Sequence, residues 1–251
     1  MKKTVLVFIL LTLNLLTACT TPVSREQFTR DLTQVVNDKS QLSKYFRRPA
    51  FYSESEYEAL LKDVLSDKDI VDAVYDDAVS NKRAYSVESI LSTGWMRTFE
   101  RKGMLLLSDQ DKAIFVEKAA ILLANLPSEK CGSVVRGELM DFKFSKADGV
   151  WVKTFSRNLL KKGAVAHDKI FKAPDKAKVG VALVALVSKA KEKMTDDEIE
   201  TIVRMSIDRD ISKHKDICSV LSKVFLLAND LEPKYRNILF DQLTFQKRGS
   251  I

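Results

Sequence analysis

Apolar residues recur every three or four positions through most of the chain after residue 24, which is the spacing of one face of an α-helix. Examples are the stripes Tyr57, Leu60, Leu61, Val64 and Tyr235, Ile238, Leu239, Leu243. The 251 residues include only eight glycines and five prolines, which leaves few turns for a β-sandwich. The sequence therefore predicts an all-α fold, either a multi-helix bundle or a short helical array, with about ten helices.

Serines mark the expected starts of two of these helices. Ser24 with Gln27, and Ser53 with Glu56, have the spacing of a capping box, in which two side chains satisfy free amides at a helix N-terminus. The connection between the two helices contains Pro49, which a helix interior does not accommodate.

One segment departs from the helical period. Residues 141–152, DFKFSKADGVWV, alternate as strands do around a turn at Gly149, so a small hairpin and an irregular loop are the alternatives. Pro174 is expected to open the next helix. Its apolar stripe is expected at Leu183, Leu186 and Val187. Residues 25–251 then form one compact helical domain or two halves that meet near residues 141–175.

The first 18 residues have the layout of a secretory signal peptide. Lys2 and Lys3 give a basic start, and residues 4–17 are a mostly apolar run of 14 residues that ends in small side chains. A membrane-spanning helix needs about 20 residues, so this run is short for a span. We therefore exclude residues 1–18 from the folded domain.

The end of this leader, Leu16-Thr17-Ala18-Cys19, resembles the lipobox of bacterial lipoproteins. The resemblance covers only about the first 20 residues. It implies cleavage before Cys19, a lipidated thiol and an acylated new N-terminus, with residues 19–24 as the lipidated cysteine and a short tether. Several acyl chains, at about 0.8 kcal/mol per buried CH₂, would hold the chain firmly on a membrane. The alternative is an ordinary secreted protein in which Cys19 is accidental.

The residue after the cysteine bears on location. In the Gram-negative members of this family an aspartate there tends to retain the protein in the inner membrane, and this chain has Thr20. The resemblance therefore implies the outer membrane, on its periplasmic side, in preference to the inner membrane or the cell surface.

Cys131 and Cys218 are the remaining thiols, and an oxidising compartment favours a disulfide between them. The alternative is two separate buried cysteines that act as small hydrophobes. Segments 108–131 and 195–218 both run from a capping box through a helix and a polar break to one of these cysteines, at an offset of 87 residues. A duplicated helical hairpin and a chance agreement are both open.

Charge is unevenly distributed along the chain. Residues 51–80 hold nine acids and two lysines, whereas residues 152–193 hold eleven bases and three acids. These clusters are solvated helix faces or pair with each other, or else they form a dipolar molecule that meets anionic lipid or an acidic partner. Without Lys2 and Lys3 the chain has 39 bases against 34 acids, an excess of +5 that is far from a dedicated nucleic-acid binder.

Motifs of catalysis and of metal binding are missing from the sequence. It has no Gly-x-Ser-x-Gly elbow, phosphate-cradling loop or Cys-x-x-Cys pair. Asp69, Asp72 and Asp76 share one helix face, for which a solvated face is a better interpretation than a cation site. We therefore assign no catalytic residue, metal or cofactor. Trp95 and Trp151 are the candidates for contact with a partner, with core packing as the alternative.

These observations favour a non-catalytic, protein-binding helical domain on a membrane-anchored envelope lipoprotein. A specific version is an immunity-type inhibitor of a toxin that acts in the periplasm, since such inhibitors share this layout. The alternatives are an envelope hydrolase with an unrecognised site and a structural or assembly factor.

Overall fold

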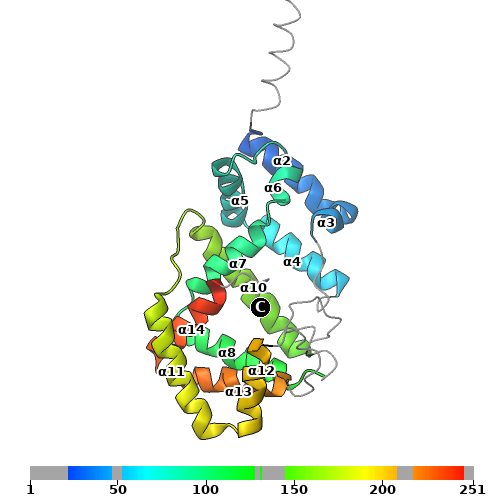
Figure 1. Ribbon diagram of the computed structural model, residues 1–251. Helices are drawn as coiled ribbons and strands as arrows, with labels where there is room; N and C mark the ends of the chain where they lie inside the picture. Colours follow the sequence, from blue (N-terminus) through cyan, green and yellow to red (C-terminus); the bar gives the residue numbers. More distant parts are fainter. Residues whose placement is uncertain (1–21, 47–52, 128–130, 132–144, 208–216, 246–251) are drawn as a thin grey trace, which may run out of the picture. The chain divides into compact units, whose positions relative to one another are not determined.

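The fold is all-α, as the periodicity predicts. The computed structural model describes residues 22–46, 53–127, 131, 145–207 and 217–245, and within these ranges it contains twelve helices and no strand (Figure 1). No helix in this part of the chain is long and apolar enough to cross a membrane. The chain divides into two compact units, which are described separately below.

The first unit is built around α2. Its helices are α2 (Arg25–Asn37), α3 (Lys39–Tyr45), α4 (Glu54–Ser66), α5 (Lys68–Ser80), α6 (Val87–Leu91), the first part of α7 (Trp95–Leu105) and nearly all of α10 (Lys146–Val165). Helix α2 contacts α3, α4, α5 and α6. Its Phe28 is fully buried, and the ring centroid of Phe28 lies 5.7 Å from that of Tyr75 on α5. This unit therefore closes around α2.

The helix starts follow the predicted caps in part. Ser53 and Glu56 form the complete capping box, each accepting a hydrogen bond from the other's backbone N–H. The Ser24 side chain accepts from the Gln27 N–H, as predicted, but the Gln27 side chain donates to Asp31 instead of reaching back to Ser24. At the start of α2, Asp31 thus takes the Gln27 side chain that would complete the capping box with Ser24.

Opposite charges join α10 to the acidic helices of the first unit. Arg157 Nε lies 3.0 Å from Asp63 Oδ2, and Lys161 Nζ lies 3.0 Å from Asp67 Oδ2. Burial opposes ionisation of Asp67, but the hydrogen bonds from Lys161 and the backbone hold the pKa of this carboxyl below its usual range. Part of the acidic cluster therefore pairs with part of the basic cluster, one of the outcomes that the charge distribution predicts.

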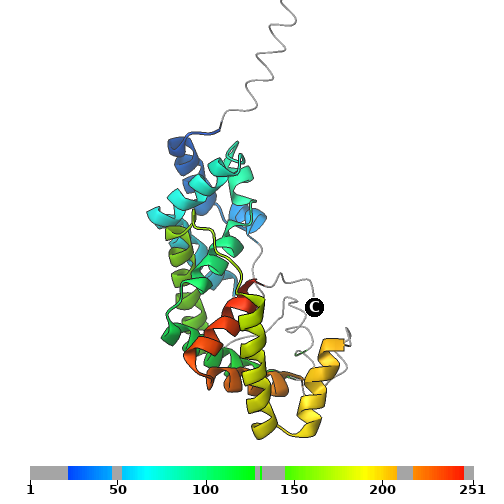
Figure 2. The ribbon, with the colours of Figure 1, turned by 60° about the vertical axis from the view of Figure 1, so that its left-hand side comes forward.

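The second unit contains the rest of α7 together with α8 (Asp109–Ala124), α11 (Lys176–Lys193), α12 (Asp196–Ile207), α13 (Ile217–Asn229) and α14 (Pro233–Phe245). Helix α8 packs along α13, and α11 packs along α14 (Figure 2). Lys112 on α8 is buried, and its Nζ lies 2.8 Å from Asp241 Oδ1 and 5.4 Å from the Phe240 ring on α14. This pairing ties α8 to α14.

The segment 141–152 is where the predicted secondary structure is wrong. Helix α10 begins at Lys146 and runs through Gly149 and Trp151, so neither a hairpin nor an irregular loop forms over residues 146–152. The Trp151 ring stacks on Phe155, one helical turn later, at a centroid distance of 4.9 Å. The alternation of apolar residues is too short to distinguish a strand from the start of a helix. Residues 141–144 lie outside the described residues.

Gly163 marks the closest approach of α10 to α7. A Cβ placed there would lie 2.7 Å from Phe99 Cα and 2.5 Å from Phe99 C, and closer still to the Phe99 carbonyl oxygen. Backbone atoms of a packed helix cannot move aside easily, and Phe99 is fully buried. Only glycine fits at position 163 without moving α7 from α10.

We predict that Gly163→Ala lowers the free energy of unfolding by about 1–3 kcal/mol through overpacking, although alanine is the better helix former. Urea unfolding followed by circular dichroism measures this change. Gly180→Ala in α11 is the matched control, because a Cβ at position 180 meets no atom within 4 Å. That variant should gain up to about 1 kcal/mol. A stabilising Gly163→Ala would contradict the close approach.

Candidate functional site

The predicted lipid site is not part of the described structure. Cys19 and the whole lipobox fall within residues 1–21, outside the described residues. The described chain begins at residue 22, and hydrogen bonds attach Val23 to the first unit. The Val23 N–H donates to the Ala84 carbonyl at 2.7 Å, and the Tyr75 hydroxyl donates to the Val23 carbonyl at 2.7 Å. Val23 is therefore attached to the first unit by both of its backbone polar groups.

The two remaining cysteines meet in the second unit. Cys131 and Cys218 form a disulfide with an S–S distance of 2.02 Å and a Cα–Cα distance of 5.6 Å. Both are buried in a cluster with Ile217, against which Leu123 at the end of α8 packs. The bond thus closes an 87-residue separation next to the α8–α13 contact. The second helix of the first proposed hairpin would fall at residues 132–144, outside the described residues.

Trp95 is not a surface for a partner. It is 1% exposed, and its ring makes edge contacts with Phe46 at 6.4 Å and with Phe99 at 5.6 Å between centroids. The prediction of a partner contact is therefore wrong for Trp95, because the start of α7 turns this side chain into the core of the first unit. Trp151 is half-buried and stacked on Phe155, so its role as a partner contact stays a prediction.

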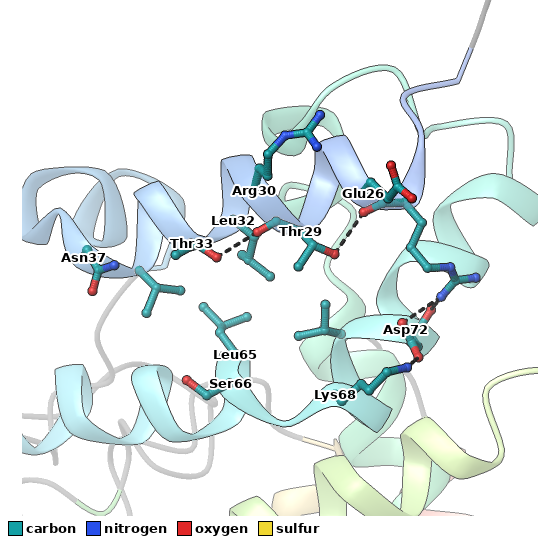
Figure 3. A pocket seen from close by; sticks show the side chains of 13 residues that line it. Glu26, Thr29, Arg30, Leu32, Thr33, Asn37, Leu65, Ser66, Lys68 and Asp72 are labelled. Carbon is teal, nitrogen blue, oxygen red and sulfur yellow. Dashed lines mark hydrogen bonds and ion pairs between the residues drawn. The ribbon is translucent and has the colours of Figure 1, made fainter.

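A groove of about 680 Å³ runs between α2 and the α4–α5 junction in the first unit (Figure 3). Leu32 of α2 and Leu65 of α4 point toward each other across it. The hydroxyl groups of Thr29 and Thr33 lie along one side, where each donates to a backbone carbonyl four residues earlier. Arg30 stands at its edge and donates to Gln27. The floor is apolar and the rim is polar.

The charged groups at one end of the groove neutralise one another. Arg25 donates to Asp72 Oδ1 at 2.9 Å and also to Asp76, and Lys68 donates to Asp72 Oδ2. Two members of the predicted row of aspartates, Asp72 and Asp76, therefore pair with cations of the same unit. The hydrogen bonds from Lys68 and Arg25 outweigh partial burial and hold the pKa of the Asp72 carboxyl below its usual range.

A carboxyl that acts as a general acid at neutral pH needs a pKa that is raised toward neutrality. Asp72, which lines the groove, has its pKa shifted in the opposite direction, so this carboxyl is not suited to that role. The described residues also contain no group of three His, Cys, Asp or Glu side chains arranged to hold a metal ion.

Helix α11 presents an apolar surface in the described part of the second unit. Four aliphatic side chains on it are about half exposed: Val181 (55%), Leu183 (47%), Val184 (66%) and Val187 (52%). We call them the α11 apolar face. Residues 181, 184 and 187 recur every three positions, so they share one side of the helix. The other side of the helix is already in use, since Ala182, Ala185 and Leu186 pack against α14.

Lysines flank the α11 apolar face at both ends. Lys176 and Lys178 lie in the first turn of α11, and Lys191 and Lys193 lie in the last. A positive charge at a helix N-terminus opposes the helix dipole, so helix stability does not account for Lys176 and Lys178. The N-cap Asp175 offsets part of that repulsion by accepting two backbone hydrogen bonds. An apolar surface with a basic border suits an apolar ligand with an acidic border.

The sequence did not reveal this surface, because the predicted core stripe of α11 was partly wrong. Leu186 packs inward, but Leu183 and Val187 are exposed. Eight of the nine residues from Val179 to Val187 are valine, leucine or alanine, so the helix is apolar on all sides. Such a helix is usually fully buried. The helix has more apolar residues than one core-facing stripe needs, and this excess was the sequence signal for an exposed apolar surface.

Comparison with models of known families, with curated protein sequences and with solved structures finds no match for this chain.

We predict that replacing Cys131 and Cys218 together by alanine lowers the stability of the second unit by about 2–5 kcal/mol, because the disulfide restrains a long loop in the unfolded chain. Hydrogen exchange should show lost protection in α8 and α13, with α2 unchanged as the internal control. Reduction of the unmodified protein should reproduce the effect. Equal protection of α8 and α13 with and without the bond would contradict this prediction.

We predict that Asp72→Asn weakens the first unit at neutral pH by about 1 kcal/mol, since it removes the shared partner of Arg25 and Lys68. The folded pKa of Asp72 lies below its unfolded value, so its contribution is present above about pH 4 and is lost as pH falls through the folded pKa. Urea unfolding of both proteins across this range measures the difference. It should vanish in acid. Asp77→Asn, on the same helix, is the control, and an effect of equal size there would contradict the pairing.

Proposed function

We propose that this protein is a membrane-anchored envelope lipoprotein whose helical domain binds a protein partner through the α11 apolar face and performs no catalysis. The lipobox at residues 16–19 supports the anchor, and Thr20 supports the outer membrane, facing the periplasm. The single observation that carries the binding role is the row of half-exposed Val181, Val184 and Val187 on a helix whose other side is packed.

The energetics favour an occupant of this face. Burial of an aliphatic side chain contributes about 1.5–3 kcal/mol, and contiguous apolar surface of this kind is characteristic of interaction sites. The bordering Lys176, Lys178, Lys191 and Lys193 select against a partner with a basic border and accelerate association with an acidic one. A partner protein with an apolar ridge between acidic side chains therefore matches both features.

The layout also specifies a version of this role. A lipoprotein that binds and blocks a toxin acting in the periplasm needs an anchor, a rigid binding surface and no active site. In the groove between α2 and the α4–α5 junction, the pKa of Asp72 is held low, which does not suit this carboxyl as the general acid of a hydrolase. We therefore place an immunity-type inhibitor ahead of an envelope enzyme.

The test is recovery of the partner from the native envelope. The full-length lipoprotein is cross-linked in the producing cells and purified, and the attached proteins are quantified by mass spectrometry. Val184→Lys should reduce recovery of the specific partner by about tenfold or more, because a charge is then buried in the apolar contact. Val165→Lys is the matched control, since Val165 is an equally exposed valine on α10.

Lys176→Glu with Lys178→Glu should slow association and reduce its dependence on salt. Equal recovery with Val184→Lys and with the unmodified protein would contradict docking on α11. Equal loss with Val165→Lys would assign the effect to general destabilisation. An intact mass without acyl chains would separately contradict the anchor.

A further inference from the structure

The anchored end of the chain cannot move far from the first unit. Cys19 and Val23 are four residues apart, and a fully extended chain spans at most about 3.6 Å per residue, so their Cα atoms are no more than about 14 Å apart. Val23 is attached through hydrogen bonds to Ala84 and Tyr75, both at 2.7 Å. An acylated Cys19 would therefore hold the part of the first unit around Ala84 close to the lipid surface.

The turn after α5 contains Ala84 and has a defined geometry. The Lys82 N–H donates to the Val79 carbonyl at 2.9 Å, and the Arg83 N–H donates to the Ala78 carbonyl at 2.7 Å. These two bonds form the Schellman arrangement that ends many helices. Lys82 occupies its left-handed position with φ of 53°. Glycine reaches this conformation without steric cost, so the chain accepts strain to place a lysine at this corner.

The side chains at this corner have the composition of a membrane-interface surface. Val79 is 38% exposed and Tyr85 is 48% exposed, with exposed Lys82 and Arg83 between them in the sequence. Tyrosine is enriched where one end of a side chain is apolar and the other is wet, as at the level of lipid headgroups. Lysine and arginine are attracted to anionic headgroups.

The two cations at this corner are also unpaired among the residues that the structure describes. Lys39, Lys44 and Lys68 of the first unit each form an ion pair with a carboxylate. Lys82 and Arg83 form none with any other side chain in the described ranges, and Ala84 next to them is buried. Two of the nearby acids already pair with other cations, Asp76 with Arg25 and Glu88 with Lys44. The third, Asp77, lies about one helical turn before the corner.

We propose that the corner at residues 79–85 is the membrane-facing surface of the lipidated protein, with Lys82 and Arg83 on anionic headgroups and Tyr85 at the interface. The inference rests on the proposed acylation of Cys19 and is independent of the α11 apolar face. Contact at this corner would fix the orientation of the first unit relative to the bilayer. Because Cys19 and Val23 are only four residues apart, the anchor would keep this corner next to the membrane.

The experiment uses the full-length lipoprotein, purified from the producing cells and checked by intact mass for its acyl chains. Tyr85→Cys provides a free thiol for an environment-sensitive fluorophore, since Cys131 and Cys218 are bonded to each other. The protein is reconstituted in vesicles of phosphatidylethanolamine and phosphatidylglycerol that carry spin-labelled lipids. Asp69→Cys is the control site, because Asp69 is exposed at the opposite end of α5, about 20 Å along the helix from the corner.

We expect the spin-labelled lipids to quench the fluorophore at position 85 several times more strongly than the one at position 69. Lys82→Glu with Arg83→Glu should reduce quenching at 85, and circular dichroism checks that this variant is folded. Replacing phosphatidylglycerol by phosphatidylcholine in the vesicles should also reduce quenching at position 85.

Acylated protein with equal quenching at positions 85 and 69 would overturn the membrane-facing corner and leave the anchor intact. Protection of position 85 in native envelopes without quenching by vesicle lipids would assign the corner to a protein partner, which also overturns it. A mass without acyl chains would overturn the anchor and this inference together.

Discussion

The requirement that each helix bury its apolar side governs both units of this chain. In the first unit, α2 meets it by packing Phe28 and Leu32 among α4, α5 and α6. In the second, α8 and α13 cover each other, and the Cys131–Cys218 bond lies within that contact. Helix α11 meets it on one side only, because it buries Ala182 and packs Leu186 but leaves Val181, Val184 and Val187 exposed. The proposed function begins from that exposed side.

Ion pairs form within both units. In the first unit, Arg25 bridges Asp72 and Asp76, and Arg157 and Lys161 bind acids of α4 and of the α4–α5 junction. In the second, Lys112 binds Asp241 and Lys223 binds Glu198, and the lysines at the two ends of α11 border an apolar surface. The uneven charge of the sequence therefore separates into a part that is paired within each unit and a part that lies on the surface.

The sequence predicted features that depend on neighbours along the chain. The helical class follows from apolar spacing, and the capping box of Ser53 and Glu56 forms because its two members are three residues apart. Gln27 shows how a local prediction fails, since Asp31 lies one turn away and competes for its side chain. Residues 146–152 were misassigned because a few alternating positions fit both a strand and a helix start.

Features that depend on packing could not be read from the sequence alone. Trp95 and Trp151 are indistinguishable as sequence, yet one lies in a core and the other on a half-buried stack. The exposure of Leu183 and Val187 depends on which side of α11 meets α14. Likewise, the attachment of Val23 to Ala84 and Tyr75 joins residues more than 50 positions apart. The pairing of Cys131 and Cys218 was a candidate because two thiols remained in a compartment that was expected to be oxidising.

The central claim is that the α11 apolar face is covered by a protein in the living envelope. The most direct measurement places a photo-cross-linking amino acid at position 184 of the full-length protein in its own cells, with position 186, which faces α14, as the internal comparison. The account predicts one dominant cross-linked protein from position 184 and none from position 186. Cross-links from position 184 to lipid alone, or no cross-link at all, would contradict it.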